Sequence, residues 1–280
     1  MPKGRRPPRA SPRRGARVPG EIPQLLLLSN SRAADGTYLT WARGEIKAFL
    51  GAPRSSVLFI PYAAVPGTRD AFDAYTQRVR TAFDDTGYDL VSVHEAADPV
   101  QAVRAAAALV IGGGNTFHLL ARLYAAGLLE VITACVRSGT PYIGWSAGSV
   151  VACPTISTTN DMPIIAPPSL RALGLVQFQI NAHYTDVHPP GHQGETRAER
   201  IAEFLRLQPA ATVVGLREGS LLHVAGSEVR LWGTGGRIFR AAEPAADWTQ
   251  RAGVRLQTAS GQLSEAGAHN CERSSKARFS

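Results

Sequence analysis

Five short, mostly apolar runs recur through the first half of the chain, each about as long as a strand that is buried on both faces. Stretches with apolar residues at helical spacing lie between them, which predicts βαβ units and a mostly parallel sheet flanked by helices. The expected strands are Leu25–Leu28, Val57–Ile60, Leu90–Val93, Ala108–Ile111 and Tyr142–Trp145. The expected helices are Trp41–Leu50, Thr68–Thr86, Pro99–Ala107 and Thr116–Ser138.

After Ser146 the alternation of strands and helices loosens. A helix is expected over Glu195–Leu207, where Thr196 and Glu199 have the spacing of a capping box. Four short strands with tight turns follow, and we expect them to add antiparallel strands at a sheet edge or to form a small second sheet. These strands are Thr212–Leu216, Leu221–Val224, Val229–Trp232 and Ile238–Ala241. The pattern predicts one α/β domain over 24–245, with polar, disordered tails at 1–23 and 246–280.

Charge is distributed unevenly along the 280 residues, whose formal net charge is +8. Residues 1–24 carry seven basic side chains and one acid, and residues 251–280 carry five basic and two acidic ones. The body between them, 25–250, therefore has a net charge of −1. A folded domain that binds a polyanion would itself carry an excess of basic side chains. We therefore expect no nucleic-acid partner for the body. A nucleic-acid-associated module that uses its basic tails is kept as the alternative from a different class.

Several other classes of protein are not indicated. No run approaches the roughly 20 apolar residues of a membrane span, and the apolar run after the first basic residues is too short for a secretory signal. The three cysteines, Cys135, Cys153 and Cys271, are an odd number without metal-site spacing. We therefore expect no membrane, no disulfide framework, no metal and a cytoplasmic location.

The sharpest local motif is Gly144-Trp145-Ser146-Ala147-Gly148, directly after an apolar strand. This is the G-x-S-x-G pattern of a nucleophile elbow, whose tight strand-to-helix turn leaves no room for larger side chains two positions either side of the serine. Ser146 would then be the nucleophile at a helix N-terminus, and the amide of Ala147 would face a developing oxyanion. The alternative is a tight turn with an incidental serine.

A second glycine-rich turn, Gly112-Gly113-Gly114-Asn115-Thr116, follows the fourth strand. It lacks the Lys of a Walker A loop, and Phe117 replaces the third glycine of a dinucleotide-binding motif, so a nucleotide cofactor is not indicated. Adjacent parallel strands end at the same edge of a sheet, which makes the Gly114 amide a candidate second oxyanion donor. The alternative is a helix-entry turn capped by Asn115 or Thr116.

A serine nucleophile requires a base, and His183 is the best placed of the seven histidines because it follows an apolar run. His188 and His192 have the i, i+4 spacing of zinc ligands, but the intervening prolines prevent the helix that would align them. The group that orients the base is either Asp161 or Glu218, and spacing alone does not choose between them.

Seven stretches in the same order resemble the peptidase E family of serine peptidases, the α-aspartyl dipeptidases, over about residues 25–241. They are Leu-Leu-Leu-Ser-Asn-Ser (26–31), Ile-Gly-Gly-Gly-Asn-Thr-Phe (111–117), Tyr-Ile-Gly-Trp-Ser-Ala-Gly (142–148), Ala-Cys-Pro-Thr-Ile (152–156), Thr-Thr-Asn-Asp-Met-Pro-Ile (158–164), Gln-Ile-Asn-Ala-His (179–183) and Gly-His-Gln-Gly-Glu-Thr-Arg (191–197). One departure is Asn-Ala-His before the base, where Asn-Pro-His is common in the family.

The resemblance implies a glutamine-amidotransferase-like architecture with added C-terminal strands. It implies hydrolysis of small peptides, dipeptides with N-terminal aspartate, without metal or organic cofactor. It places the nucleophile on Ser146 and the base on His183, and both acids match positions proposed for the third member. It places the oxyanion donors on Gly114 and Ala147, and Arg197 at the position expected to hold the aspartyl carboxylate of the substrate.

Two related kinds of hydrolase are alternatives to a peptidase E. A cyanophycinase-like amidase, which acts on aspartyl linkages in a polymer, shares the elbow and is the alternative within this class. A glutamine amidotransferase usually has a cysteine nucleophile where Ser146 stands in this chain. The residue preferred after aspartate and the oligomeric state are left open by the sequence.

Overall fold

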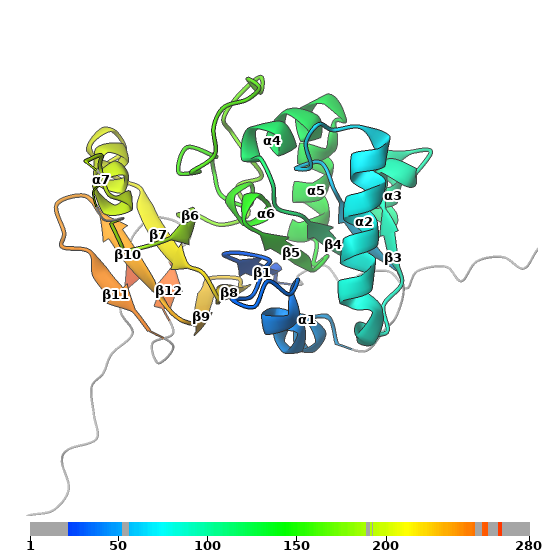
Figure 1. Ribbon diagram of the computed structural model, residues 1–280, viewed down its shortest axis with the longest axis horizontal. Helices are drawn as coiled ribbons and strands as arrows, with labels where there is room; N and C mark the ends of the chain where they lie inside the picture. Colours follow the sequence, from blue (N-terminus) through cyan, green and yellow to red (C-terminus); the bar gives the residue numbers. More distant parts are fainter. Residues whose placement is uncertain are drawn as a thin grey trace, which may run out of the picture.

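Two sheets make up the protein, for which a computed structural model describes residues 22–51, 56–188, 191, 193–249, 254–256 and 263–264. The larger sheet has the strand order β13-β12-β9-β8-β1-β5-β4-β2-β3, and the smaller has the order β11-β10-β7-β6. In Figure 1 the smaller sheet and α7 lie at one end of the molecule, and the parallel half of the larger sheet with its helices lies at the other.

The parallel half of the larger sheet contains the five strands that the apolar runs predict. They are β1 (Gln24–Leu28), β2 (Val57–Ile60), β3 (Leu90–Ser92), β4 (Ala108–Ile111) and β5 (Tyr142–Trp145). The pairs β1–β5, β5–β4, β4–β2 and β2–β3 are all parallel. The predicted α/β class with a mostly parallel sheet is confirmed.

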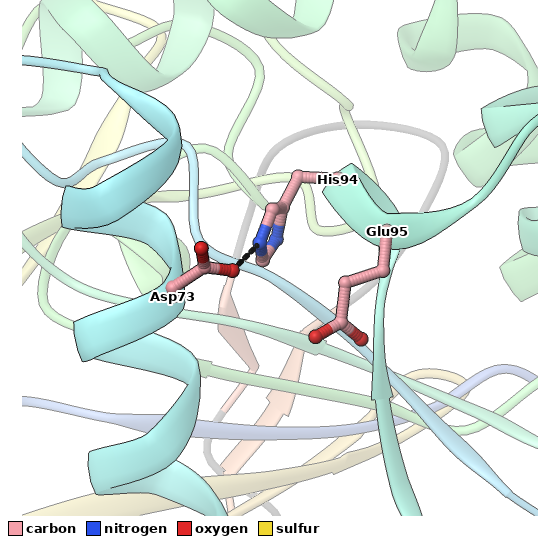
Figure 2. A group of neighbouring side chains, drawn as sticks. All are labelled: Asp73, His94 and Glu95. Atoms are coloured by element: carbon pink, nitrogen blue, oxygen red, sulfur yellow. Dashed lines mark hydrogen bonds and ion pairs between the residues drawn. The ribbon is translucent and has the colours of Figure 1, made fainter.

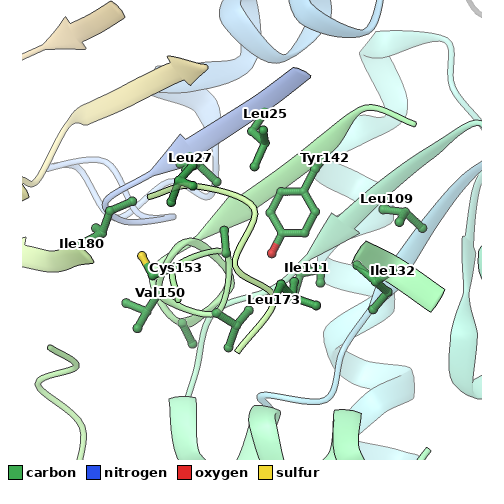
Figure 3. Close-up of a cluster of buried hydrophobic side chains, with 14 of the residues drawn as sticks. Leu25, Leu27, Leu109, Ile111, Ile132, Tyr142, Val150, Cys153, Leu173 and Ile180 are labelled. Carbon is green, nitrogen blue, oxygen red and sulfur yellow. The ribbon is translucent and has the colours of Figure 1, made fainter. Parts of the chain in front are cut away.

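Helices cover both faces of this sheet, which explains why its strands are mostly apolar and do not alternate with polar residues. Leu25 and Leu27 of β1 belong to one core cluster, and Leu26 and Leu28 belong to the other. Figure 3 shows the first cluster, where side chains of β1, β4 and β5 meet α5 and the segment around α6. The helices are α1 (Arg43–Leu50), α2 (Arg69–Phe83), α3 (Pro99–Ala105), α4 (Thr116–Ala125), α5 (Leu128–Arg137), α6 (Ala147–Val150) and α7 (Arg197–Leu207), with 3₁₀ turns η1 (Thr40–Ala42), η2 (Asp84–Thr86) and η3 (Val93–Glu95).

The strands of the second half divide between the two sheets, so both predicted arrangements occur. The strand β8 (Ser220–Ala225) joins the larger sheet antiparallel to β1, followed outward by β9 (Glu228–Gly233), β12 (Val254–Leu256) and β13 (Leu263–Ser264). The smaller sheet contains β6 (Gln179–Tyr184), β7 (Thr212–Arg217), β10 (Gly236–Arg240) and β11 (Ala246–Trp248). The helix α7 packs on it through Ile201 and Leu205.

Two predicted boundaries differ from the structure. The helix expected over Thr116–Ser138 is two helices bent by 95° at Gly127, because this glycine adopts φ 63° and ends α4. The domain boundary placed at 245 lies too early, because β11 follows it, pairs with β10 and buries Trp248 to 3% exposure. A three-residue strand is too short to show periodicity. Residues 1–21 of the expected N-terminal tail lie outside the described residues.

No single helix in the described part of the chain has the length and apolar composition needed to cross a membrane. The helices α4 and α5 meet that test only as a pair, across their 95° bend. Neither Cys135 nor Cys153 forms a disulfide among the described residues, and burial raises the pKa of Cys153 to about 12.

Leu27 and Leu207 offer a matched test of the core, because Leu27 is fully buried and Leu207 is 84% exposed. We expect Leu27→Ala to lower the free energy of unfolding by about 2–5 kcal/mol, since it removes apolar contacts and leaves a cavity. Leu207→Ala should change it by less than about 0.5 kcal/mol. Urea unfolding of both variants measures the difference, and equal losses would contradict this assignment of the core.

Candidate active site

Ser146 lies in the sharp turn between β5 and α6, with φ 51° and ψ −116°. Residues other than glycine rarely adopt such a conformation, and it is typical of a nucleophile elbow. A Cβ at Gly144 would lie 2.5 Å from the carbonyl oxygen of Gly148, and a Cβ at Gly148 would overlap the carbonyl oxygen of Ile111. The G-x-S-x-G spacing is therefore a steric requirement of this turn.

A hydrogen-bonded line of three side chains begins at Ser146. Its Oγ lies 2.9 Å from Nε2 of His183, and Nδ1 of His183 lies 2.7 Å from Oε1 of Glu218. His183 belongs to β6, where φ 54° and a shift of register against β7 turn its side chain out of the regular strand pattern. Glu218 follows the end of β7. The imidazole and the carboxylate are both accessible, with 42% and 64% of their side chains exposed.

Asp161, the other acid that the sequence offers as the orienting group, lies at the amino end of α4. One carboxylate oxygen, Oδ2, accepts hydrogen bonds from the Thr116 amide (2.7 Å) and from the hydroxyls of Thr116 and Thr159. A carboxylate is favoured there by the unpaired amides and the dipole of the helix. The structure thus brings Glu218 to the imidazole, and it uses Asp161 to hold the start of α4.

Two polar residues directly after β1 position this line of side chains, and sequence reasoning gave neither a role. The Ser29 hydroxyl donates to the Leu216 carbonyl (2.7 Å) and accepts from the His183 amide (2.9 Å). The Asn30 side chain accepts from the amide of Gly219 (2.8 Å), next to Glu218. Their signal in the sequence is a pair of polar residues ending a buried strand, but their partners lie more than 150 residues away.

Each glycine of the triple-glycine turn after β4 makes a different close approach. A Cβ at Gly112 would lie 2.5 Å from the Tyr75 hydroxyl, and one at Gly113 would lie 2.9 Å from Cβ of Ser146. Gly114 has φ 138°, and its Cβ would overlap the carbonyl oxygen of Ala63. The turn therefore lies directly against the nucleophile and against a buried tyrosine. The cap predicted after it is present, because Oδ1 of Asn115 accepts from the His118 amide.

Tyr75 fixes the orientation of the peptide between Gly113 and Gly114. Its hydroxyl donates to the Gly113 carbonyl (2.9 Å) and accepts from Nε1 of Trp145 (3.0 Å). Because a trans peptide directs its C=O and N–H to opposite sides, the Gly114 N–H is directed away from Tyr75. Burial raises the pKa of Tyr75 well above its usual value, so the hydroxyl stays protonated and keeps donating.

The amide of Ser146 is already used, since it donates to the Leu28 carbonyl (3.0 Å). In the described part of the chain, the amides of Gly114 and Ala147 donate to no backbone carbonyl. Ala147 is the first residue of α6, where an amide has no acceptor within the helix. Two backbone donors are thus available on the two turns that flank Ser146.

A cavity of about 690 Å³ opens over the nucleophile. Its lining includes Ser146, His183 and the Gly113–Gly114 turn, together with residues from the β1–α1 connection and from α2. The wall also carries the ionised side chains of Arg32, Arg78 and Asp161. The space admits a small polar molecule that carries negative charge.

Arg197 lies beside this cavity and does not line it. Its Nη1 donates to Oδ1 of Asn160 (2.7 Å), and the residue lines a smaller cavity of about 170 Å³. Asp161 lines both cavities, so Arg197 is separated from the nucleophile by the 158–161 loop. Partial burial lowers the pKa of its guanidinium.

The described residues contain one group with the spacing of metal ligands, formed by Asp73, His94 and Glu95 (Figure 2). Both ring nitrogens of His94 are engaged, by Asp73 at 2.8 Å and by the Ser92 hydroxyl at 2.6 Å, and the Glu95 carboxylate pairs with Arg80 at 2.8 Å. The group therefore links α2 to η3. Of the two histidines that have the spacing of zinc ligands in the sequence, His188 contacts the Gly194 carbonyl, and His192 lies outside the described residues.

The comparisons with known proteins show the family of the chain. Residues 25–232 match the model of peptidase family S51. The chain belongs to peptidase family S51. It is 50% identical over 210 residues to peptidase E of a Nostoc strain, covering 75% of this chain and 86% of the relative. It is 49% identical over 210 residues to peptidase E of Shewanella amazonensis, covering 75% and 88%.

Solved structures share the fold. A peptidase from an acI-B1 Actinobacterium superposes with a TM-score of 0.64 at 18% identity, over 84% of this chain and 97% of that one. A putative peptidase E protein from Listeria monocytogenes gives 0.59 at 21% identity, over 76% and 98%. Family membership confirms the predicted resemblance and makes this S51 member a serine peptidase, and it favours neither the nucleic-acid module nor the cyanophycinase-like amidase.

Gly148 and Gly44 provide a matched test of the elbow, because both are helical glycines and a Cβ at Gly44 meets nothing within 4 Å. We expect Gly148→Ala to cost about 1–3 kcal/mol of stability and to reduce peptidase activity, because the new methyl group must displace the turn that carries Ser146. Gly44→Ala should be neutral or slightly stabilising. Thermal unfolding and a peptidase assay measure both effects, and an unaffected Gly148→Ala variant would contradict the steric argument.

Proposed function

We propose that this S51 peptidase hydrolyses dipeptides with N-terminal aspartate, through an acyl-enzyme on Ser146. The observation that carries the proposal is the line from Ser146 Oγ through the His183 imidazole to the Glu218 carboxylate, at 2.9 and 2.7 Å. Family membership and half-identical relatives named peptidase E support the same reaction. The alternative of a cyanophycinase-like amidase has no comparable support.

In the proposed reaction, Ser146 attacks the carbonyl carbon of the peptide bond after aspartate. Nε2 of His183 takes the hydroxyl proton and then gives it to the leaving amine. Glu218 holds Nδ1–H of His183, which fixes the tautomer and stabilises the imidazolium. Water then hydrolyses the acyl-enzyme with the same base. These steps require no metal or organic cofactor, since the chain supplies nucleophile, base and orienting acid.

The amides of Gly114 and Ala147 are the proposed donors to the oxyanion. Each lies on a turn beside Ser146, and neither has a backbone acceptor in the described chain. A single donor of this kind is worth about 3–4 kcal/mol in the barrier. Tyr75 acts through one of them, because it holds the Gly113 carbonyl and thereby sets the direction of the Gly114 N–H.

Arg197 is proposed to attract the side-chain carboxylate of the substrate's aspartate from behind the 158–161 loop. A guanidinium pairs well with a carboxylate, and partial burial strengthens the attraction by removing competing water. Its bond to Oδ1 of Asn160 fixes its position. The expected cytoplasmic location, inferred from cysteine usage, stays a prediction.

A dipeptide panel tests the proposed activity. The wild type should cleave Asp-Leu in preference to Glu-Leu, Asn-Leu and β-Asp-Leu, and Ser146→Ala should lower the rate at least about a thousandfold, because the nucleophile is lost. Release of leucine is measured by chromatography, with thermal unfolding as the control for folding. Faster cleavage of β-aspartyl-arginine than of Asp-Leu would instead identify an amidase of the cyanophycinase type.

Isosteric variants of Glu218 and Asp161 distinguish which of the two acids orients His183. Glu218→Gln should lower kcat by about a hundredfold or more, because an amide at that position favours the wrong tautomer of His183 and leaves the imidazolium unpaired. Asp161→Asn should retain far more activity and lose about 0.3–1 kcal/mol of stability from the start of α4. Steady-state kinetics and urea unfolding measure both, and a larger kcat loss in Asp161→Asn would exchange the two assignments.

A further inference from the structure

Two arginines flank one aromatic ring on the wall of the cavity that faces the nucleophile. Cζ of Arg32 lies 6.0 Å from the centroid of the Tyr38 ring, and Cζ of Arg78 lies 5.9 Å from the same centroid. Arg78 also lies 6.0 Å from the ring of Tyr75, whose hydroxyl holds the Gly113 carbonyl beside Ser146. The two cations thus line the active-site cavity and lie over the same ring.

Neither arginine forms an ion pair with a carboxylate of the described residues, although their neighbours do. On α2 itself, Arg80 pairs with Glu95 at 2.8 Å and Arg69 with Asp73 at 3.9 Å. Nη1 of Arg32 donates to the carbonyl of Gly36, an uncharged acceptor. The one acid on the cavity wall, Asp161, is held by threonines at the start of α4.

Two like charges gathered without an acid repel each other, and an anion bound in the cavity offsets that repulsion. The Cζ atoms of both arginines lie over tyrosine rings at cation–π distance. The N–H groups on the edge of Arg78 remain suited to a bidentate pair with a carboxylate. This wall therefore has the chemistry of a carboxylate site.

The geometry also indicates which carboxylate of the substrate it would take. The helix α7, which begins at Arg197, lies on one side of α6, and α2 lies on the other (Figure 1). Asp161 lines both cavities, and they extend from it on different sides of the 158–161 loop, so the aspartyl residue and the leaving residue would have separate directions from Ser146. In a dipeptide, the leaving residue ends in a free α-carboxylate, whereas in a longer peptide an uncharged amide occupies that position.

We propose that Arg78, assisted by Arg32, binds the α-carboxylate of the leaving residue and so restricts the enzyme to dipeptides. This inference rests on the proposed function, since it assumes that aspartate occupies the opposite side of Ser146. Arg78 is a specificity-determining residue and takes no part in bond breaking. The guanidinium of Arg78 strengthens the binding only of substrates whose leaving residue carries a free carboxylate.

The test compares Asp-Leu with Asp-Leu amide, which differ only in that carboxylate. The wild type should show a kcat/KM at least about tenfold higher for Asp-Leu, as expected of a charge-assisted hydrogen bond. Arg78→Gln should lower kcat/KM for Asp-Leu toward the value for the amide, chiefly through KM, and leave the amide reaction within about twofold. Arg78→Lys should give an intermediate kcat/KM for Asp-Leu, because lysine keeps the positive charge but cannot form the bidentate pair of a guanidinium.

Arg69→Gln is the control, because Arg69 lies on the same helix outside the cavity lining. It should change neither substrate. An unchanged KM for Asp-Leu in Arg78→Gln and in Arg32→Gln would overturn the proposal, and so would equal losses on both substrates, which indicate a structural role. Failure of the proposed function has a different signature, since the wild type would then hydrolyse neither compound, and that result would overturn both.

Discussion

The turn that carries Ser146 packs so closely against the end of β4 that position 148 admits no side chain. This close approach governs much of the site. It sets the backbone of Ser146 at a positive φ and starts α6 directly behind it, and the triple-glycine turn lies against its Cβ. A looser contact would leave the nucleophile and the two amide donors without fixed mutual positions, and preorganisation of such donors is the main source of oxyanion stabilisation.

The end of β1 explains how groups from distant parts of the chain meet at this turn. β1 lies between β5 and β8, so its last residues touch the elbow on one side and the later strands on the other. The Leu28 carbonyl accepts from the Ser146 amide, and the Ser29 amide donates to the Ser220 carbonyl. The Ser29 side chain reaches His183 and Asn30 reaches the turn of Glu218. One short polar segment thereby fixes nucleophile, base and acid together.

Features that depend on local sequence were predictable, and features that depend on distant contacts were not. Apolar runs indicated the parallel strands, and the glycine spacing indicated the elbow, because burial and turn sterics act within a few residues. The choice between Asp161 and Glu218 depends on which acid the fold brings to His183, which no local pattern encodes. The break at Gly127 was missed because the apolar spacing continues across it, although a glycine in left-handed conformation ends α4.

The net charge of the chain and the placement of individual charges also give different information. The net charge of +8 belongs to the chain ends, and the body between residues 25 and 250 carries −1. Within that neutral body, most surface arginines of the small sheet pair with acids, as Arg217 does with Asp186 and Asp247. Arg32 and Arg78 differ because their surroundings in the cavity wall supply rings in place of carboxylates. The proposed anion site is therefore indicated by which arginines have no acidic partner among the described residues, and the net charge of the chain does not indicate it.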